Sequence, residues 1–99
     1  MTSNETAPYI GKYVLMGINY VDQQNEVVER QQLHGFIVRI SQDEGIVVRF
    51  EDGSEFHLPP NLKSLQPAEP GEYYLQEVEE VVLDPDFVTV WTLPVEDRQ

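Results

Sequence analysis

The chain has 99 residues, a length that predicts one domain, and its 18 acidic and 6 basic residues give a formal net charge of −12 at pH 7. This charge repels nucleic-acid backbones and anionic membranes and attracts cationic partners. The absence of cysteine excludes disulfides, thiolate metal sites and cysteine catalysis, and it fits a reducing cytoplasm.

The amino-terminal residues predict a flexible tail. Residues 1–8, MTSNETAP, contain neither a basic region nor an apolar run, so we expect no signal peptide. No apolar segment approaches the length that spans a bilayer. We therefore expect a cytoplasmic protein with a tail over 1–8, one β domain over 9–94 and a second tail over 95–99.

Residues 9–21, YIGKYVLMGINYV, predict a first strand that is apolar on both faces. The β-branched residues and two glycines favour a strand over a helix, and a glycine inside a strand often marks a bulge or a bend. A polar turn follows over 22–26. The next strand begins near Val27, and we expect it to be long and to bend around Gly35.

The stretch 33–65 organises the chain, because apolar residues recur there at every second position, which is the period of a half-buried strand. Pairing Ile40 with Ile46 keeps the apolar side chains of two strands on one face. The pairs expected further along are Val38 with Val48 and Phe36 with Phe50. The expected buried face comprises Phe36, Val38, Ile40, Ile46, Val48, Phe50, Phe56 and Leu58.

The turn over residues 51–53 determines which side chains of the third strand lie on the same face as those of the second. A two-residue loop at Asp52 and Gly53 would place Phe56 on the opposite face from Phe50. A three-residue loop with Gly53 in the left-handed conformation keeps both rings on one face. Burying both rings is worth a few kcal/mol, which outweighs the turn preference, so we predict the three-residue loop.

The remaining elements complete a β fold. Pro59 and Pro60 end the third strand, and the spacing of Leu62 and Leu65 predicts one 3-10 turn near 60–65. A strand from Tyr73, broken near 79–80 into a hairpin, and a last strand over 87–93 follow. Meandering strands, a helical turn and another strand are the order of SH3-like barrels. We therefore predict an all-β, SH3-like antiparallel barrel with an additional carboxyl-terminal strand or hairpin.

Several segments resemble a group of small uncharacterised bacterial all-β proteins. They are 11–15 (GKYVL), 33–35 (LHG), 58–60 (LPP), 70–73 (PGEY), 85–87 (PDF) and 91–92 (WT). These segments span nearly all of the chain and consist mostly of turn and core residues. The resemblance implies a small bacterial β protein and carries over no activity.

Candidate catalytic and metal-binding residues are few. A zinc site needs three or four ligands, and His34 and His57, the only histidines, would make at most a weak site with a carboxylate such as Glu55. We interpret one as a partly exposed imidazole and the other as a hydrogen-bonded neighbour of the core. The serines lie in the tail or in turns, outside any nucleophile elbow. We predict no catalytic residue, no cofactor, no metal and no enzyme activity.

Two arginines suggest one possible interface. The predicted register places Arg39 opposite Val47 and Arg49 near Ile37, so the two apolar residues would form a small outer patch flanked by guanidinium groups. Such a patch favours either simple packing of the arginine stems or a partner site.

The carboxyl-terminal third suggests a second interface, because no basic residue lies between Lys63 and Arg98. Strand alternation is expected to turn Glu77 and Glu79 to one face. The partner-binding residues predicted from both surfaces are Glu72, Glu77, Glu79, Glu80, Asp84, Asp86, Arg39 and Arg49.

These observations favour a non-catalytic interaction module whose acidic surface binds a basic protein, as an immunity protein, an anti-toxin or an adaptor would. One alternative is a nucleic-acid-binding SH3-like or OB-like barrel, since exposed aromatic rings can stack on bases. The acidic charge opposes that alternative. A small enzyme or ligand-binding barrel is the other alternative, and it would require a cavity with convergent polar groups.

Overall fold

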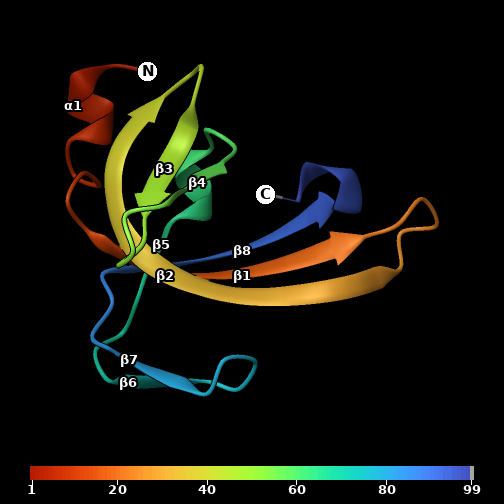
Figure 1. Ribbon diagram of the computed structural model, residues 1–99. Helices are drawn as coiled ribbons and strands as arrows, with labels where there is room; N and C mark the ends of the chain where they lie inside the picture. The colour runs from red at the N-terminus through yellow and green to blue at the C-terminus, as the bar shows by residue number, and fades with distance from the viewer. Residues whose placement is uncertain (99) are drawn as a thin grey trace.

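The computed structural model describes residues 1–98 and consists mainly of two β-sheets (Figure 1). The strands are β1 (Tyr13–Val21), β2 (Val27–Ser41), β3 (Gly45–Arg49), β4 (Glu55–Leu58), β5 (Gln66–Pro67), β6 (Glu72–Leu75), β7 (Glu80–Leu83) and β8 (Phe87–Pro94). The helical turns are α1 (Ser3–Thr6), η1 (Leu62–Ser64) and η2 (Val95–Asp97). The six-stranded sheet has the order β4-β3-β2-β1-β8-β5, and β6 pairs only with β7. The predicted all-β class is confirmed.

The main sheet differs from the predicted antiparallel barrel in two ways. Strands β4 and β5 are its two edges, so the pairing among residues 1–98 leaves the sheet open. Strand β8 also runs parallel to β1. Asp86 explains the direction of β8, because its N–H donates to the Tyr13 carbonyl at 2.9 Å and its carboxylate accepts from the Tyr13 N–H at 2.9 Å. The chain therefore re-enters the sheet beside the start of β1 and follows the same course.

Strand β2 carries the bend predicted at Gly35. It is 15 residues long and curves from the tip of the β1–β2 arm around to β3 (Figure 1). A Cβ atom on Gly35 would lie 2.4 Å from the carbonyl oxygen of Arg49. The curve therefore brings two backbones so close together that only glycine fits.

A β-bulge in β2 corrects the predicted core. Ile40 pairs with Ile46 as expected, but the register shifts between Ile37 and Arg39, so Ile37 faces Val48 and Phe36 faces Arg49. The Ile37 N–H donates to the Lys12 carbonyl at 2.9 Å, and its carbonyl accepts from the Gly11 N–H at 2.7 Å. These bonds tie Ile37 to the two residues that precede β1. The extra residue of the bulge reverses the side chains that follow.

The outcome of the bulge is that Ile37 is fully buried and Phe36 is 53% exposed, the reverse of the prediction. The Phe36 ring instead packs edge-on against Tyr13, with ring centroids 4.7 Å apart. Val38 is half-buried. The predicted outer patch of Ile37 and Val47 is wrong, because both side chains are completely buried.

The three-residue turn at 51–53 is confirmed. Gly53 has a φ of +88°, and the Phe50 N–H donates to the Ser54 carbonyl at 2.9 Å. Val48 consequently faces Phe56, and the Phe50 and Phe56 rings lie 6.3 Å apart.

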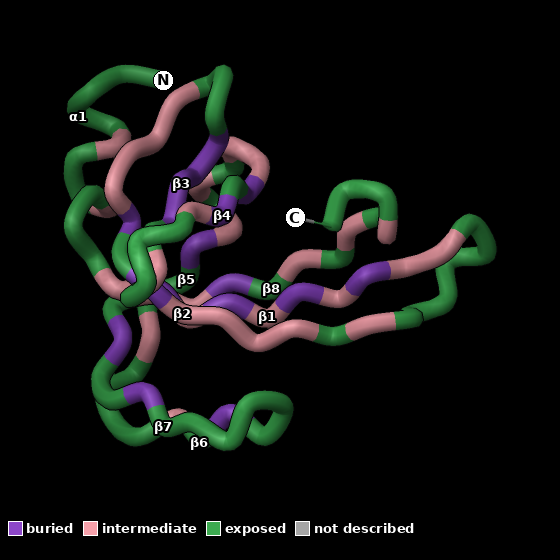
Figure 2. The backbone as a smooth tube through the Cα atoms, viewed as in Figure 1, coloured by how far each residue is buried: buried purple, intermediate pink, exposed green. Residues whose placement is uncertain are grey.

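The core lies in the concave side of the curved sheet, between β1 and the β3–β4 pair (Figure 2). Its members are Val14, Met16, Ile18, Tyr20, Ile37, Ile46, Val48, Phe56, Leu58 and Leu65. The predicted members Ile46, Val48, Phe56 and Leu58 are thus confirmed, and Ile40 and Phe50 pack against this cluster while half-buried. Along β1, alternate residues are fully and partly buried, so the second face of this strand is also partly covered.

Short helical turns lie outside the two sheets, and one of them, η2, falls in the predicted carboxyl-terminal tail. The predicted tail over 1–8 contains α1, where Thr2 and Glu5 form a capping box. The predicted turn near 60–65 is η1, capped by Asn61. No helix within residues 1–98 is long and apolar enough to cross a membrane.

Candidate functional site

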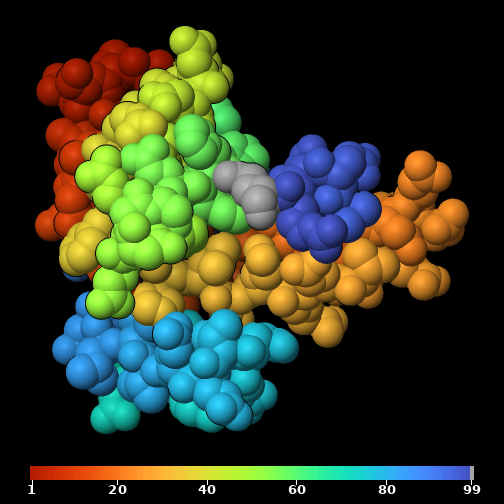
Figure 3. All heavy atoms as spheres, in the orientation of Figure 1, coloured from red at the N-terminus to blue at the C-terminus, as the bar shows by residue number. Residues whose placement is uncertain are grey.

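The β6–β7 hairpin forms a second sheet, whose strands pair with each other and not with the strands of the main sheet. In Figure 3 it forms a separate layer, cyan to blue, packed below the golden atoms of β2. Its strands pair Tyr73 with Val82 and Tyr74 with Val81. The inner residues Leu75 and Val82 are buried, at 3% and 4% exposure. The hairpin is therefore docked on the sheet through one of its two faces.

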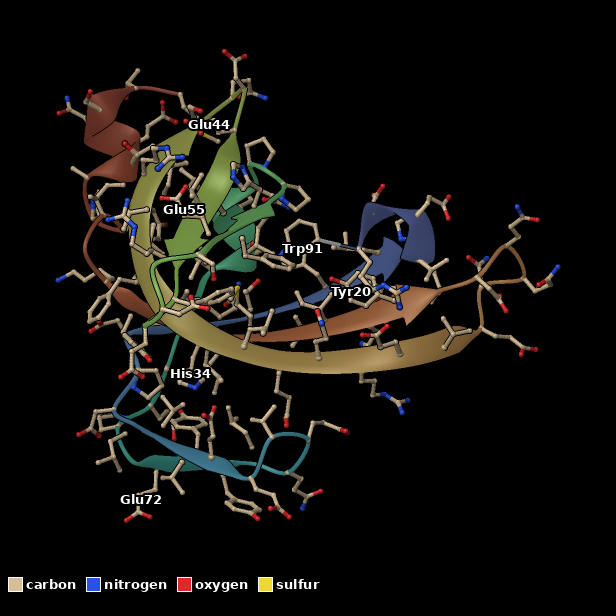
Figure 4. All side chains as sticks on the ribbon, viewed as in Figure 1. Tyr20, His34, Glu44, Glu55, Glu72 and Trp91 are labelled. Atoms are coloured by element: carbon tan, nitrogen blue, oxygen red, sulfur yellow. The ribbon has the colours of Figure 1, made fainter. Side chains whose placement is uncertain are left out.

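Two polar contacts hold the hairpin in place. His34 of β2 lies between two side chains: its Nδ1 atom is 2.5 Å from the Tyr13 hydroxyl, and its Nε2 atom is 2.8 Å from a carboxylate oxygen of Glu80. The Glu77 N–H also donates to the side-chain carbonyl of Gln32 at 2.7 Å. Figure 4 labels His34 in the layer between β2 and the hairpin.

The direction of these hydrogen bonds follows from the state of the tyrosine. Burial, with the nearby carboxylates of Glu51 and Glu80, raises the pKa of Tyr13 above its ordinary value. The phenol is therefore protonated at neutral pH and can donate to Nδ1 of His34. In the tautomer that carries the ring proton on Nε2, His34 donates in turn to Glu80. The cluster is a donor chain that positions the hairpin, and a phenol with a raised pKa is a poor nucleophile or base.

The outer face of the hairpin is apolar and exposed. Strand alternation places Glu72, Tyr74, Val81 and Leu83 on the face that points away from the sheet. Tyr74, Val81 and Leu83 are 60%, 51% and 65% exposed. We call these three residues the hairpin patch. Figure 4 shows Glu72 directed away from the main sheet at its border.

The predicted acidic residues fall into two groups around this patch. Glu72, Glu77 and Glu79 are exposed, and within residues 1–98 their carboxylates have no cationic partner. Glu77 and Glu79 lie in the turn over 76–79 and not on a strand, so the prediction that alternation orients them is wrong. Glu79 has a φ of +53°, which helps to reverse the chain there.

The other three predicted acids have structural roles. Glu80 holds His34. Asp84 accepts a hydrogen bond from the Gly71 N–H at 2.7 Å and closes the base of the hairpin. Asp86 is bonded to the backbone of Tyr13, as described above. The structure therefore brings the six acids onto one segment but leaves only the first three unpaired.

The two predicted arginines belong to an ion-pair network on β2, β3 and β4. Arg39 donates to both carboxylate oxygens of Glu44 and of Glu55, at 2.8–3.0 Å. Arg49 adds a bond of 2.9 Å to Glu55. Both guanidinium groups lower the pKa of Glu55 to about 2, and that of Arg39 also lowers the pKa of Glu44. Figure 4 shows both glutamates at this end of the molecule.

The two histidines lie in different parts of the molecule. His57 of β4 has Nδ1 3.0 Å from the carbonyl oxygen of Glu44, whereas His34 faces the hairpin. Within residues 1–98, no three His, Cys, Asp or Glu side chains are grouped closely enough to hold a metal ion.

Sequence reasoning missed two features of this site. The His34–Glu80 contact joins residues 46 positions apart, and no local pattern signals it. The hairpin patch could have been predicted from the sequence. Once a hairpin turn is placed at 76–79, strand alternation puts Tyr74, Val81 and Leu83 on one face.

Comparison of the chain with protein-family models, curated proteins and solved structures gave no match in any of the three searches.

Proposed function

We propose that this protein is a non-catalytic interaction module that binds a cationic protein through the hairpin patch. The observation that carries the proposal is an exposed apolar face, Tyr74, Val81 and Leu83, on a segment that has unpaired carboxylates and no Lys or Arg between positions 63 and 98. An aromatic anchor with apolar neighbours and a charged rim is the usual composition of a protein-binding surface.

The charge determines which partner such a surface favours. Glu72 shares the outer face with the patch, and Glu77 and Glu79 lie in the turn of the same hairpin. Among residues 1–98 none of the three forms an ion pair, so their charge is available to attract a basic surface. A cytoplasmic immunity protein or anti-toxin that neutralises a basic enzyme would bind through such an acidic surface, and so would an adaptor. The same charge opposes the alternative of nucleic-acid binding.

The proposal includes the expectation that no residue is essential for turnover. An enzymatic alternative would use the cluster of Tyr13, His34 and Glu80, but the raised pKa of Tyr13 keeps its phenol protonated, so the cluster supplies no phenolate base or nucleophile. A hydrolase screen in which His34→Asn or His57→Asn abolished an activity would favour the alternative.

We also propose that the fold is related to the SH3-like barrel, with the sheet left open instead of closed. Its support is the order of elements, a meander of β2, β3 and β4 followed by η1 and a further strand. The parallel β8 and the inserted hairpin would be departures from that plan.

The test uses the full chain as bait and a displayed library of random 12-residue peptides as the probe. We expect the selected peptides to be rich in Lys and Arg around apolar residues. Binding of a selected synthetic peptide is expected to weaken at least tenfold in Val81→Ser and Leu83→Ser, since both side chains are exposed and their replacement leaves the core intact. Raising the salt from 0.05 to 0.5 M is expected to weaken it further.

The matched control is Val28→Ser, which removes a side chain that is 54% exposed at the tip of the β1–β2 arm. It is expected to bind the peptide as the parent does. Selection of peptides with no excess of basic residues, or binding that survives both hairpin substitutions, would refute the proposal.

A further inference from the structure

The outer edge of β8 is open over most of its length. One side of the strand pairs with β1 from Phe87 to Pro94, but on the other side β5 covers only Phe87 and Val88. Beyond Val88, no strand within residues 1–98 pairs with this edge. Val90, at 73%, and Thr92 are exposed there.

The ladder with β5 shows which backbone groups face the open edge. The Ala68 N–H donates to the Asp86 carbonyl at 3.0 Å, and the same register sets Gln66 opposite Val88. The Asp86 carbonyl thus faces β5, while its N–H is bonded to Tyr13, and Val88, two positions on, lies at the next hydrogen-bonding position toward β5. Alternate residues of a strand face the same neighbour, so the N–H and C=O groups of Val90 and Thr92 also point to the open edge.

This edge lacks the devices that protect the other edges of the sheet. From Thr89 to Leu93 there is no charged residue and no proline, and the register with β1 is continuous. The edge strand β4 carries Glu55 and is followed by Pro59, and β5 contains Pro67. Edges without charge, proline or bulge are the ones that pair with another strand.

We propose that the outer edge of β8 pairs with the same edge of a second copy of this chain, antiparallel about a two-fold axis at Trp91. In this register Val90 of each copy faces Thr92 of the other. The N–H and C=O groups of Val90 and Thr92, four in each copy, then all form hydrogen bonds with the other copy. Trp91 faces its own counterpart at the non-hydrogen-bonded centre. The open segment is bounded by β5 at Val88 and by Pro94, and Trp91 lies at its middle.

A second copy suits this edge better than a cationic partner does. The five residues of the edge are uncharged and offer a basic protein no attraction, whereas they are complementary to themselves. Two chains of charge −12 repel each other, so salt is expected to strengthen this association as the Debye length falls from ~10 Å at 0.1 M. Salt weakens binding of a cationic partner, so the two proposals respond to salt in opposite directions.

Sedimentation velocity of the full chain over 5–500 µM, in 0.05 and 0.5 M NaCl, tests the proposal. We expect a monomer–dimer equilibrium that tightens in the higher salt. Val90→Pro removes an N–H that, by this alternation, points to the open edge and away from β1, and it is expected to weaken dimerisation at least tenfold. Val90→Thr keeps this N–H and is the control, expected to dimerise as the parent does.

Cysteine pairing tests the register, because the parent chain has no cysteine. Val90→Cys mixed with Thr92→Cys and oxidised with diamide is expected to give a covalent dimer, since facing residues are about 5.5 Å apart at Cα. Either variant alone, or with Gln24→Cys, is expected to remain mostly monomeric. A parent chain that is monomeric at every concentration, or a dimer that Val90→Pro leaves unchanged, would overturn the proposal. A dimer lost in Leu83→Ser and kept in Val90→Pro would assign self-association to the hairpin patch.

Discussion

The hydroxyl of Tyr13 lies 2.5 Å from Nδ1 of His34, on the strand that pairs with its own. The phenol contacts one nitrogen of the imidazole, and the imidazole presents its other nitrogen to Glu80 at 2.8 Å. This short chain of side chains connects the main sheet to the hairpin, so the patch on the outer face of the hairpin depends on it.

Loss of His34 is expected to loosen the hairpin without unfolding the sheet. In His34→Ala, both side-chain hydrogen bonds are absent, and the amides of 73–75 and 80–82 are expected to exchange about tenfold faster, which corresponds to roughly 1.4 kcal/mol. Hydrogen exchange followed residue by residue measures this effect, and the amides of β3 are expected to be unaffected. Glu72→Gln on the outer face of the same hairpin is the control. Equal acceleration in both variants would contradict the positioning role of His34.

The bulge in β2 predicts opposite costs for two neighbouring residues. Ile37→Ala is expected to lower the free energy of unfolding by about 2–5 kcal/mol, because Ile37 is fully buried. Phe36→Ala is expected to cost about 1 kcal/mol, since its ring is exposed and contacts mainly Tyr13. Urea denaturation of both variants measures the difference. Val48→Ala and Phe56→Ala, at about 2–4 kcal/mol each, provide the scale for core truncations. A larger loss for Phe36→Ala would indicate the unbulged register.

Gly35→Ala is expected to cost about 3 kcal/mol or more, because its Cβ atom would lie 2.4 Å from a backbone oxygen that cannot rotate away. Gly17→Ala is the matched control on the neighbouring strand. Its Cβ atom would meet only a Val90 methyl group at 3.8 Å, and it is expected to be neutral or slightly stabilising. Thermal unfolding of the two variants checks both expectations, and similar melting temperatures would refute the close approach at Gly35.

The ion-pair network predicts a loss of stability in acid. The pKa of Glu55 is about 2 in the folded chain, below its ordinary value of 4.5. A carboxyl with a depressed pKa stabilises the fold above its ordinary pKa, and this contribution is lost as the pH falls from about 4.5 to about 2. The urea midpoint of the parent is therefore expected to fall over this range.

Glu55→Gln is expected to lower the urea midpoint at pH 7 and to flatten its decrease between pH 4.5 and 2. Glu72→Gln removes a carboxylate that has no ion pair within residues 1–98, and it should retain the slope of the parent. An unchanged slope in Glu55→Gln would show that Glu55 is not responsible for the acid dependence.

The sequence by itself determined the all-β class, the strand from Val27 that bends at Gly35, and the three-residue turn at Gly53. These features depend on local properties: period-two alternation, the conformational freedom of glycine, and the requirement that two phenylalanines share a face. The sequence also determined the net charge and the absence of basic residues between Lys63 and Arg98, because both follow from counting charged residues.

Tertiary structure alone decided the position of the bulge, the parallel pairing of β8 and the contact of His34 with Glu80. Ile37 is buried because Gly11 and Lys12 bond its backbone, and β8 runs parallel because Asp86 bonds to Tyr13. Each of these contacts joins segments that lie more than 20 residues apart in the chain. Local alternation fixes which side chains of a strand share a face, but only the pairing of distant backbones fixes which of its two faces is buried.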